Sequence, residues 1–213
     1  KKTYTTFGLR RDYHTTTGEY YTGRLTGSYK LNNNTKLRTN IGTSVRFPAL
    51  YSLHHGNHLN NKTNLKAETG KSIDLGFDKF FPKKNINLSL TTFYLKYKND
   101  IKGWKSNSGG VGEKYYSGGG NYALDNTNSD TKSYGLEFQS EWRPNNDLSL
   151  SLGYTRTESR DGSTCDNPDA TGGPGSNPCN DEMNVRVPRH QINLSTTQIL
   201  TDELKQTIKL KYV

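Results

Sequence analysis

"YGLEFQSEWRPNNDLSLSLGYT", residues 134–155, consists of two alternating segments joined by a short polar stretch. In each segment the apolar residues fall on one parity: Tyr134, Leu136, Phe138 and Trp142, then Leu148, Leu150, Leu152 and Tyr154. A period of two with one apolar and one polar face indicates a half-buried β-strand. The connection "PNND" (144–147) consists of turn-forming residues. The stretch therefore predicts an antiparallel hairpin.

The same alternation recurs along the chain and predicts nine strands, at 3–13, 20–31, 36–46, 71–81, 85–98, 131–143, 147–158, 188–200 and 204–213. Tight connections at 31–35, 82–85, 144–147 and 201–203 alternate strictly with longer ones at 14–19, 47–70, 99–130 and 159–187. In an up-and-down antiparallel sheet every second connection lies on the same edge. The pattern therefore predicts short turns on one edge and long loops on the other, as in outer-membrane barrels. Greek-key crossings of a soluble sandwich would scramble this order.

Composition agrees with a sheet that has two different faces. The hydrophobic fraction of the 213 residues is only 30% and the mean hydropathy is -0.94, yet there are 14 Tyr, 7 Phe and 2 Trp. Disordered chains are poor in aromatics, so a wet second face explains the polarity better. The alternation alone does not say which face points outward, and a soluble sheet with one solvated face stays open. No apolar run approaches the ~20 residues of a transmembrane helix.

Charge and motifs exclude other classes of protein. The formal net charge is +9, but Lys and Arg are spread along the strands, which argues against nucleic acid as a partner. No nucleophile elbow, phosphate loop or HExxH motif is present, so we expect no enzyme activity.

One strand breaks the alternation. In "INLSLTTFYLKY" (86–97) the apolar residues change parity after Leu90. A β-bulge near Thr91–Thr92, or emergence of the strand above a membrane, would explain the change. Aromatic residues near strand ends, namely Tyr94, Tyr97, Trp142 and Tyr154, are expected to form interfacial girdles.

Four segments resemble motifs of the TonB-dependent receptors. "VRFPALYSL" (45–53) is similar to the family's "FRAPTLYEL" box, with departures at Val45 and Phe47. "TNLKAETGKSIDLGF" (63–77) resembles "NPNLKPETSKSYELGF", with Thr63 and Ala67 in place of prolines. Residues 134–155 resemble its "xGxE" strand, turn and next strand, and "RVPRHQINL" (186–194) resembles its "R.P.H.l.l" box. The motif positions are Arg46, Pro48, Leu50, Asn64, Leu65, Glu68, Gly135, Glu137, Pro188 and Arg189.

The resemblance implies a 22-stranded barrel of the Gram-negative outer membrane, closed by an N-terminal plug that contacts TonB and is energised by the inner-membrane complex. We expect residues 1–213 to be one partial barrel domain without the plug, a fragment in contact with the lipid bilayer and lipopolysaccharide. The implied activity is energy-coupled uptake of a large chelate, a ferric siderophore or cobalamin, with no permanently bound cofactor. A passive porin-like or adhesive barrel, or a soluble β-sandwich adhesin, is the alternative.

Two loops contain candidate ligand-binding residues. His54, His55 and His58 lie between the first two motifs; they would ligate haem in a haem receptor, or they are ordinary polar loop residues. The glycine-rich segment 109–120 and its neighbourhood supply Tyr115, Tyr116 and Tyr122 as amphipathic contact residues.

The two cysteines, Cys165 and Cys179, flank a Gly/Pro/Asn/Asp-rich segment. We expect a disulfide there, formed in an oxidising compartment, with two free thiols as the alternative. The same loop, 161–182, contains Asp161, Asp166, Asp169, Asp181 and Glu182. Such oxygen-rich clusters can bind Ca²⁺, although the spacing matches no defined calcium loop and a solvated acidic loop is the simpler interpretation.

Overall fold

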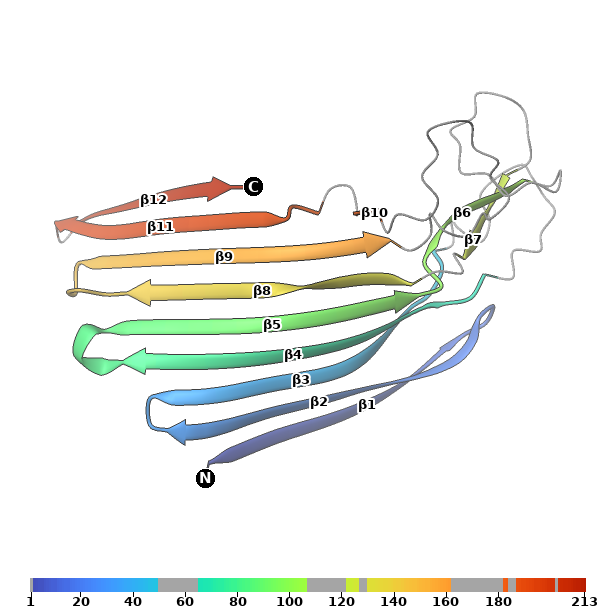
Figure 1. The fold of residues 1–213 in the computed structure, drawn as a ribbon, viewed down its shortest axis with the longest axis horizontal. Helices are drawn as coiled ribbons and strands as arrows, with labels where there is room; N and C mark the ends of the chain where they lie inside the picture. The colour runs from blue at the N-terminus through green and yellow to red at the C-terminus, as the bar shows by residue number, and fades with distance from the viewer. Residues whose placement is uncertain are drawn as a thin grey trace.

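The computed structural model describes residues 2–49, 65–106, 122–126, 130–161, 182–183, 187–201 and 203–213. They form one large antiparallel sheet with the strand order β1-β2-β3-β4-β5-β8-β9-β11-β12 (Figure 1). Its strands are β1 (Thr3–His14), β2 (Gly18–Asn32), β3 (Thr35–Arg46), β4 (Glu68–Phe81), β5 (Ile86–Lys98), β8 (Thr131–Trp142), β9 (Leu148–Asp161), β11 (His190–Thr201) and β12 (Leu204–Tyr212). The predicted class, an antiparallel up-and-down partial barrel, is confirmed.

Three short strands were not predicted. β6 (Ile101–Ser106) and β7 (Tyr122–Asn126) form a separate two-stranded sheet, and β10 (Glu182–Met183) pairs with the end of β9. All three lie in segments that the sequence presents as loops, and none is long enough to show a clear period of two. Among the described residues, no helix is long and apolar enough to cross a membrane.

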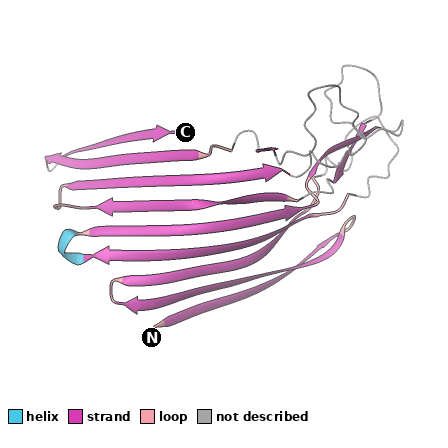
Figure 2. Cartoon of the chain, viewed as in Figure 1, coloured by secondary structure: helices cyan, strands magenta, loops and turns pink. Residues whose placement is uncertain are grey.

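The two edges of the sheet differ as expected, with one exception. The connections β2–β3, β4–β5, β8–β9 and β11–β12 are short and lie on one edge, which we call the turn edge; the connection of β4 to β5 is the 3₁₀ turn η1 (Pro82–Lys84) (Figure 2). The opposite edge is the loop edge. Its first connection is a tight turn, so strict alternation of short and long connections was wrong there. His14 Nδ1 accepts hydrogen bonds from the backbone N–H groups of Thr16 (3.3 Å) and Thr17 (3.4 Å), and Gly18 supplies the required positive φ of 88°.

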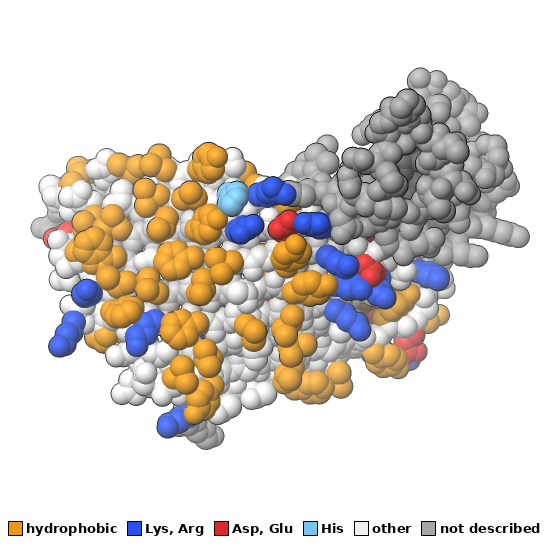
Figure 3. All heavy atoms as spheres, viewed as in Figure 1, with side chains coloured by type: hydrophobic (Ala, Val, Ile, Leu, Met, Phe, Trp, Pro, Cys, Tyr) orange, Lys and Arg blue, Asp and Glu red, His pale blue; other side chains and the backbone are white. Residues whose placement is uncertain are grey.

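Strand pairing collects the apolar residues into continuous rows. One row crosses the sheet through directly opposed partners: Tyr29, Leu37, Phe77, Leu90, Phe138, Tyr154, Ile192 and Tyr212. These side chains are not covered, as Leu75 in the adjacent row is 57% exposed and Phe77 is 40% exposed. Apolar side chains are spread over much of the face in view in Figure 3. In the described part of the chain the only buried apolar side chains are those of Pro48, Leu65 and Ala67. A sheet with almost no internal core and one apolar face has to be covered by another apolar phase.

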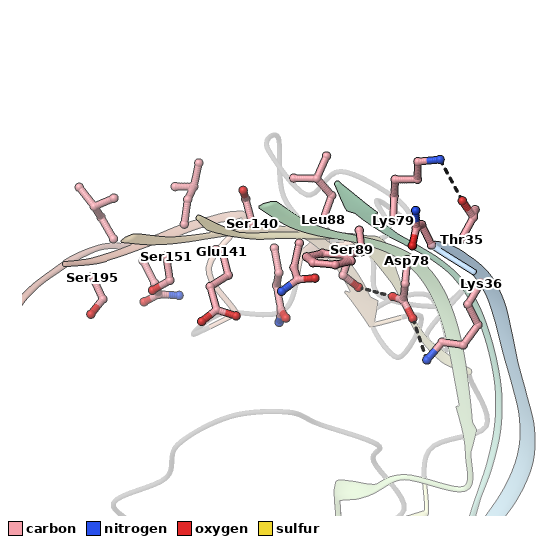
Figure 4. Close-up of a pocket in the computed structure, with 18 of the residues that line it drawn as sticks. Thr35, Lys36, Asp78, Lys79, Leu88, Ser89, Ser140, Glu141, Ser151 and Ser195 are labelled. Atoms are coloured by element: carbon pink, nitrogen blue, oxygen red, sulfur yellow. Dashed lines mark hydrogen bonds and ion pairs between the residues drawn. The ribbon is translucent and has the colours of Figure 1, made fainter. Parts of the chain in front are cut away.

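The curvature of the sheet shows which face points outward. Leu88 and Ser140 project from the convex side, whereas Ser89, Glu141 and Ser151 project from the concave side (Figure 4). By strand alternation, Leu88 and Ser140 share the face of the apolar rows and Glu141 shares the polar face. The apolar face is therefore convex, which is the lipid-facing arrangement of a membrane barrel. This answers the question that the sequence left open.

The change of parity in β5 is not a bulge. β5 pairs with β4 and with β8 without any register shift. Phe93 and Tyr97 lie on the concave side, where they cover glycines of the neighbouring strands: a Cβ placed on Gly135 would lie 2.8 Å from the Phe93 ring, and one on Gly70 would lie 2.9 Å from the Tyr97 ring. Aromatic side chains thus fill the space left by missing side chains. Tyr97 is consequently not part of a lipid-facing girdle.

The other expected girdle residues lie on the convex face at different heights. Trp142 ends β8 at the turn edge, and Tyr94 opposes Tyr134 toward the loop edge. Tyr154 belongs to the row of Leu90 and Phe138 in the middle of the apolar face, so its expected place in a girdle was wrong. Its hydroxyl is instead hydrogen-bonded to His190 Nδ1 at 2.9 Å.

Candidate functional site

The concave face is a polar wall. We use that name for Lys36, Arg38, Asn40, Asp74, Asp78, Ser89, Thr91, Glu137 and Gln139, which come from β3, β4, β5 and β8. They share one face because every second residue of each strand points to the same side. All of them except Lys36 and Asp78 line, together with residues of β1 and β2, a groove of about 760 Å³. A polar face of this kind is stable when it lines a wet lumen.

Arg38 is the centre of the wall. Its Nε donates to Asp78 Oδ2 at 2.9 Å, and its Nη2 donates to Ser89 Oγ at 3.0 Å and to Thr91 Oγ1 at 3.1 Å. Asp78 is also paired with Lys36 at 3.2 Å and accepts a hydrogen bond from Ser89 at 2.9 Å. The planar, five-donor guanidinium suits this bridging of three strands better than an ammonium would.

A second set of contacts lies nearer the loop edge. Asn40 Oδ1 accepts from Arg24 Nε at 2.7 Å, and Asn40 Nδ2 donates to Asp74 Oδ2 at 2.8 Å. Arg24, Asn40 and Asp74 come from three consecutive strands, so the contacts run across the sheet. The concave face therefore carries charges of both signs in two hydrogen-bonded sets, each of which holds its side chains in place.

The bases of two long loops meet in what we call the loop collar: Arg46, Phe47, Pro48, Leu65, Lys66, Ala67, Glu68, Asn99 and Asn126. Glu68 is its anchor, with a side chain only 8% exposed. Its carboxylate accepts from Arg46 through both Nε and Nη2, the latter at 3.0 Å, and from the Ile101 backbone N–H at 2.9 Å. Bidentate pairing of this kind is among the stronger protein hydrogen bonds. It joins the end of β3, the start of β4 and the start of β6.

Asn126 joins the same segments from the other side. Its Oδ1 accepts from the Lys66 backbone N–H at 2.7 Å, and its Nδ2 donates to the backbone carbonyls of Lys66 (3.0 Å) and Asn99 (2.6 Å). Asn99 in turn donates to the carbonyl of Ala67 at 3.5 Å. Sequence reasoning missed Asn126, because a single asparagine next to a glycine-rich loop has no distinguishing pattern.

Phe47, one of the departures from the family motif, packs against two aromatic rings. Its ring stacks on His14 with a centroid distance of 5.0 Å and meets Tyr20 edge-on at 5.7 Å. Tyr20 OH also accepts from the Ala67 backbone N–H at 3.4 Å. Beside this cluster, Arg46 keeps 76% of its side chain exposed although it is paired with Glu68. The concave rim thus presents aromatic surface next to an accessible guanidinium.

The predicted motif positions fall in three places. Arg46, Pro48, Leu65 and Glu68 lie together in the loop collar, where Pro48 is buried and Leu65 is 3% exposed. Leu50 and Asn64 lie outside the described residues.

The remaining motif positions lie elsewhere in the sheet. Gly135 cannot carry a side chain, because a Cβ there would lie 2.0 Å from the carbonyl oxygen of Arg156. Glu137 projects from the polar wall. Pro188 and Arg189 are exposed at the start of β11, where the Arg189 carbonyl accepts from the Thr157 N–H at 3.0 Å. Four of these positions thus form one structure, and the others have separate roles in the sheet.

Most loop candidates lie outside the described residues, namely His54, His55, His58, Tyr115, Tyr116, Cys165 and Cys179. Only the backbone of Tyr122 is described, opposite Ser106 in the β6–β7 pair. At the ends of the acidic loop, Asp161 and Glu182 oppose each other in the β9–β10 pairing. Among the described residues no group of three His, Cys, Asp or Glu side chains is placed to hold a metal ion. The haem, disulfide and calcium hypotheses remain predictions.

An open antiparallel sheet with a convex apolar face, a concave polar wall and long loops on one edge defines the wall of an outer-membrane type of β-barrel. Residues 3–207 match the family described as TonB dependent receptor-like, beta-barrel. The chain therefore belongs to the TonB-dependent receptor-like β-barrel family, a family of outer-membrane receptors and not of enzymes. No curated protein sequence matches the chain.

Solved structures share the fold at low sequence identity. A ferric enterobactin receptor mutant (PfeA, G324V) from Pseudomonas aeruginosa superposes with a TM-score of 0.77 at 22% identity, covering 99% of this chain and 30% of that one. The siderophore receptor PirA from Acinetobacter baumannii gives a TM-score of 0.71 at 22% identity, covering 99% and 31%. The copper transporter OprC gives a TM-score of 0.60 at 16% identity, covering 86% and 25%. This chain thus spans about a third of the length of the receptors that it resembles.

Proposed function

We propose that the chain forms part of the barrel of an outer-membrane receptor that takes up an anionic ferric siderophore by TonB-dependent, energy-coupled transport. The observation that carries the proposal is the match to the TonB-dependent receptor family over residues 3–207. Most of the similar structures are receptors for siderophores or ferric enterobactin.

The geometry supports this role in two ways. The polar wall lines a wide lumen-facing groove, so the inner surface of the barrel suits a plug or a hydrated ligand instead of lipid. At the loop edge, the exposed guanidinium of Arg46 lies beside the Phe47 aromatic cluster. Arginine next to aromatic rings is well suited to an anionic chelate with flat organic groups.

Cobalamin and haem remain alternative cargoes, and copper is named for one neighbour. The haem alternative depends on His54, His55 and His58, whose placement lies outside the described residues. A passive porin-like or adhesive barrel is the alternative class, because the polar wall alone would suit either.

The test is iron uptake by the full-length receptor that carries this chain, expressed in a host that lacks its own siderophore receptors. We expect radiolabelled ferric siderophore to accumulate in cells with TonB and not in an isogenic strain without it. Haem and cyanocobalamin are tested in parallel, with a His54→Ala/His55→Ala/His58→Ala variant as control for the haem arm. Uptake that is equal with and without TonB would establish a passive barrel and sink the proposal.

A further inference from the structure

Four basic residues form a straight row on the convex face near the loop edge. In the strand register Lys71 opposes Lys96, Lys96 opposes Lys132, and Lys132 opposes Arg160. We call these four residues the cationic row. They share the face of the apolar rows, because Ile73, Tyr94 and Tyr134 form the adjacent row on that face. Basic side chains also gather beside the grey segments in Figure 3.

The position of the row matches the boundary of the lipid-facing band. Lys71 and Phe81 are ten residues apart in β4, and Phe81 lies at the turn edge in the row of Ile86 and Trp142. Ten residues rise about 34 Å along a strand. With a tilt of about 40° this spans about 26 Å across the membrane, close to the ~25 Å height of an apolar band. If Phe81 and Trp142 mark one boundary, the cationic row therefore lies at the other.

Acidic neighbours compensate only part of the charge. Lys96 pairs with Asp130 at 2.5 Å, and Arg160 pairs with Glu158 at 2.9 Å. Within the described part of the chain, Lys71 and Lys132 make no ion pair.

Further cations and a groove lie beside the row. Arg156 on β9 and Lys98 on β5 project from the same face. A groove of about 350 Å³ is lined by Lys71, Lys96 and Lys98, together with Tyr21 and Val45. An excess of positive charge thus borders a hollow directly above an apolar surface.

We propose that the cationic row and this groove bind the phosphates of a phosphorylated glycolipid of the outer leaflet, whose acyl chains lie on the apolar rows below. The row spans three strand spacings, about 14 Å, which is long enough to reach two phosphates of one headgroup. Basic residues at the headgroup level attract anionic lipids, and the aromatic pair Tyr94–Tyr134 lies where interfacial aromatics are expected. The proposal rests on the convex face meeting lipid with the loop edge at the outer leaflet. It does not depend on which cargo is transported.

The experiment measures binding of fluorescent bisphosphorylated lipid A to the purified full-length receptor that carries this chain. In the double variant Lys71→Glu/Lys132→Glu, we expect the Kd to rise at least about tenfold, because each basic residue near an anionic surface contributes about fivefold. The neutral variant Lys71→Gln/Lys132→Gln should show a smaller rise and guards against misfolding of the first. The matched control is Lys83→Glu/Lys84→Glu, the same charge change at the turn edge, where we expect less than a twofold change.

Competition identifies the chemical group that is recognised. Dephosphorylated lipid A should compete at least about tenfold more weakly than the bisphosphorylated form, and phosphatidylglycerol should be weaker than bisphosphorylated lipid A. Equal Kd values for the row variants and the turn-edge control would overturn the proposal, as would equal competition by the dephosphorylated lipid. Equal competition by phosphatidylglycerol would overturn the assignment to a glycolipid. Siderophore uptake measured on the same variants is expected to be unchanged, so failure here is distinguishable from failure of the transport proposal.

Discussion

The convex and concave faces of the sheet are built from alternate residues of the same strands, yet they are stabilised in different ways. On the convex face Leu37, Phe77 and Leu90 stand in line and are each about 40% exposed, so the rest of their burial has to come from outside the protein. On the concave face Arg38 and Asp78 are held by hydrogen bonds within the protein. The polar wall explains a mean hydropathy of -0.94 in a membrane-facing chain: each strand gives half of its residues to a wet surface.

The largest loss of stability is expected where two strands approach each other without room for a side chain between them. Gly135→Ala places a methyl group 2.0 Å from the Arg156 carbonyl oxygen, so β8 and β9 cannot keep their register. We expect destabilisation by more than about 3 kcal/mol or no folded barrel at all. The loss is measured as heat-modifiable mobility of the full-length receptor on gels. Gly8→Ala, where nothing lies within 4 Å of the new Cβ, is the control, and a folded Gly135→Ala barrel of normal stability would contradict the close approach.

The two faces are compared directly by placing the same charge on each. Leu90→Arg introduces a cation in the middle of the convex apolar face and should cost about 2–4 kcal/mol in a bilayer. Gln139→Arg introduces the same cation on the polar wall and should cost close to zero, since lumen substitutions are tolerated. Denaturant titration of receptor folded into vesicles gives both values. If Gln139→Arg were the more harmful change, the assignment of the faces would be reversed.

The next largest effect is expected in the loop collar, because it is the only part of the described chain with buried apolar side chains. Glu68→Ala leaves the Ile101 N–H and the Arg46 guanidinium without their acceptor, and we expect a loss of about 1–3 kcal/mol. The effect should appear as faster hydrogen exchange or proteolysis at 99–106 and near 47–49. Glu141→Ala breaks the exposed pair with Arg143 at the turn edge and should change little. Equal protection in both variants would show that Glu68 does not anchor the loops.

The smallest effect is expected within the polar wall. Arg38→Lys keeps the charge beside Asp78 but loses the fork that reaches Ser89 and Thr91. Because Arg38 is 40% exposed, we expect only about 1 kcal/mol, measured by the same vesicle titration. Arg143→Lys, in an exposed pair, should be neutral. A cost above 3 kcal/mol would mean that the wall is as tightly built as a buried core.

The strands of the large sheet could be predicted because their information is local. Alternation at residues such as Leu148, Leu150 and Leu152 depends only on chain geometry, and the tight turns have recognisable residues. Of the two explanations offered for the break in β5, the bulge was wrong, because the pairing of Phe93 with Gly135 depends on a residue of another strand. The direction of curvature, which decides what each face meets, is likewise a property of the whole sheet.

The candidate site was predictable in part for the same reason. Arg46, Pro48, Leu65 and Glu68 were identified by their resemblance to family motifs, and the structure brings them together. Asn126 could not be identified from the sequence, because its partners Lys66 and Asn99 become its neighbours only after folding. The cationic row was also invisible in the sequence, since its members are more than twenty residues apart and only the register aligns them.

The order of the strands has a consequence for how the sheet forms. Along β1 to β5 each strand pairs with the one before it, and at the turn edge the β4–β5, β8–β9 and β11–β12 pairs are joined by short turns. Closing such short loops takes little entropy, so each hairpin can form before its neighbours arrive. The slow steps are then the β3–β4, β5–β8 and β9–β11 pairings, each of which must wait for a long loop to close. The overall folding rate of the sheet should consequently depend on closure of the long loops at the loop edge. The rate at which each hairpin forms depends instead on its short turn.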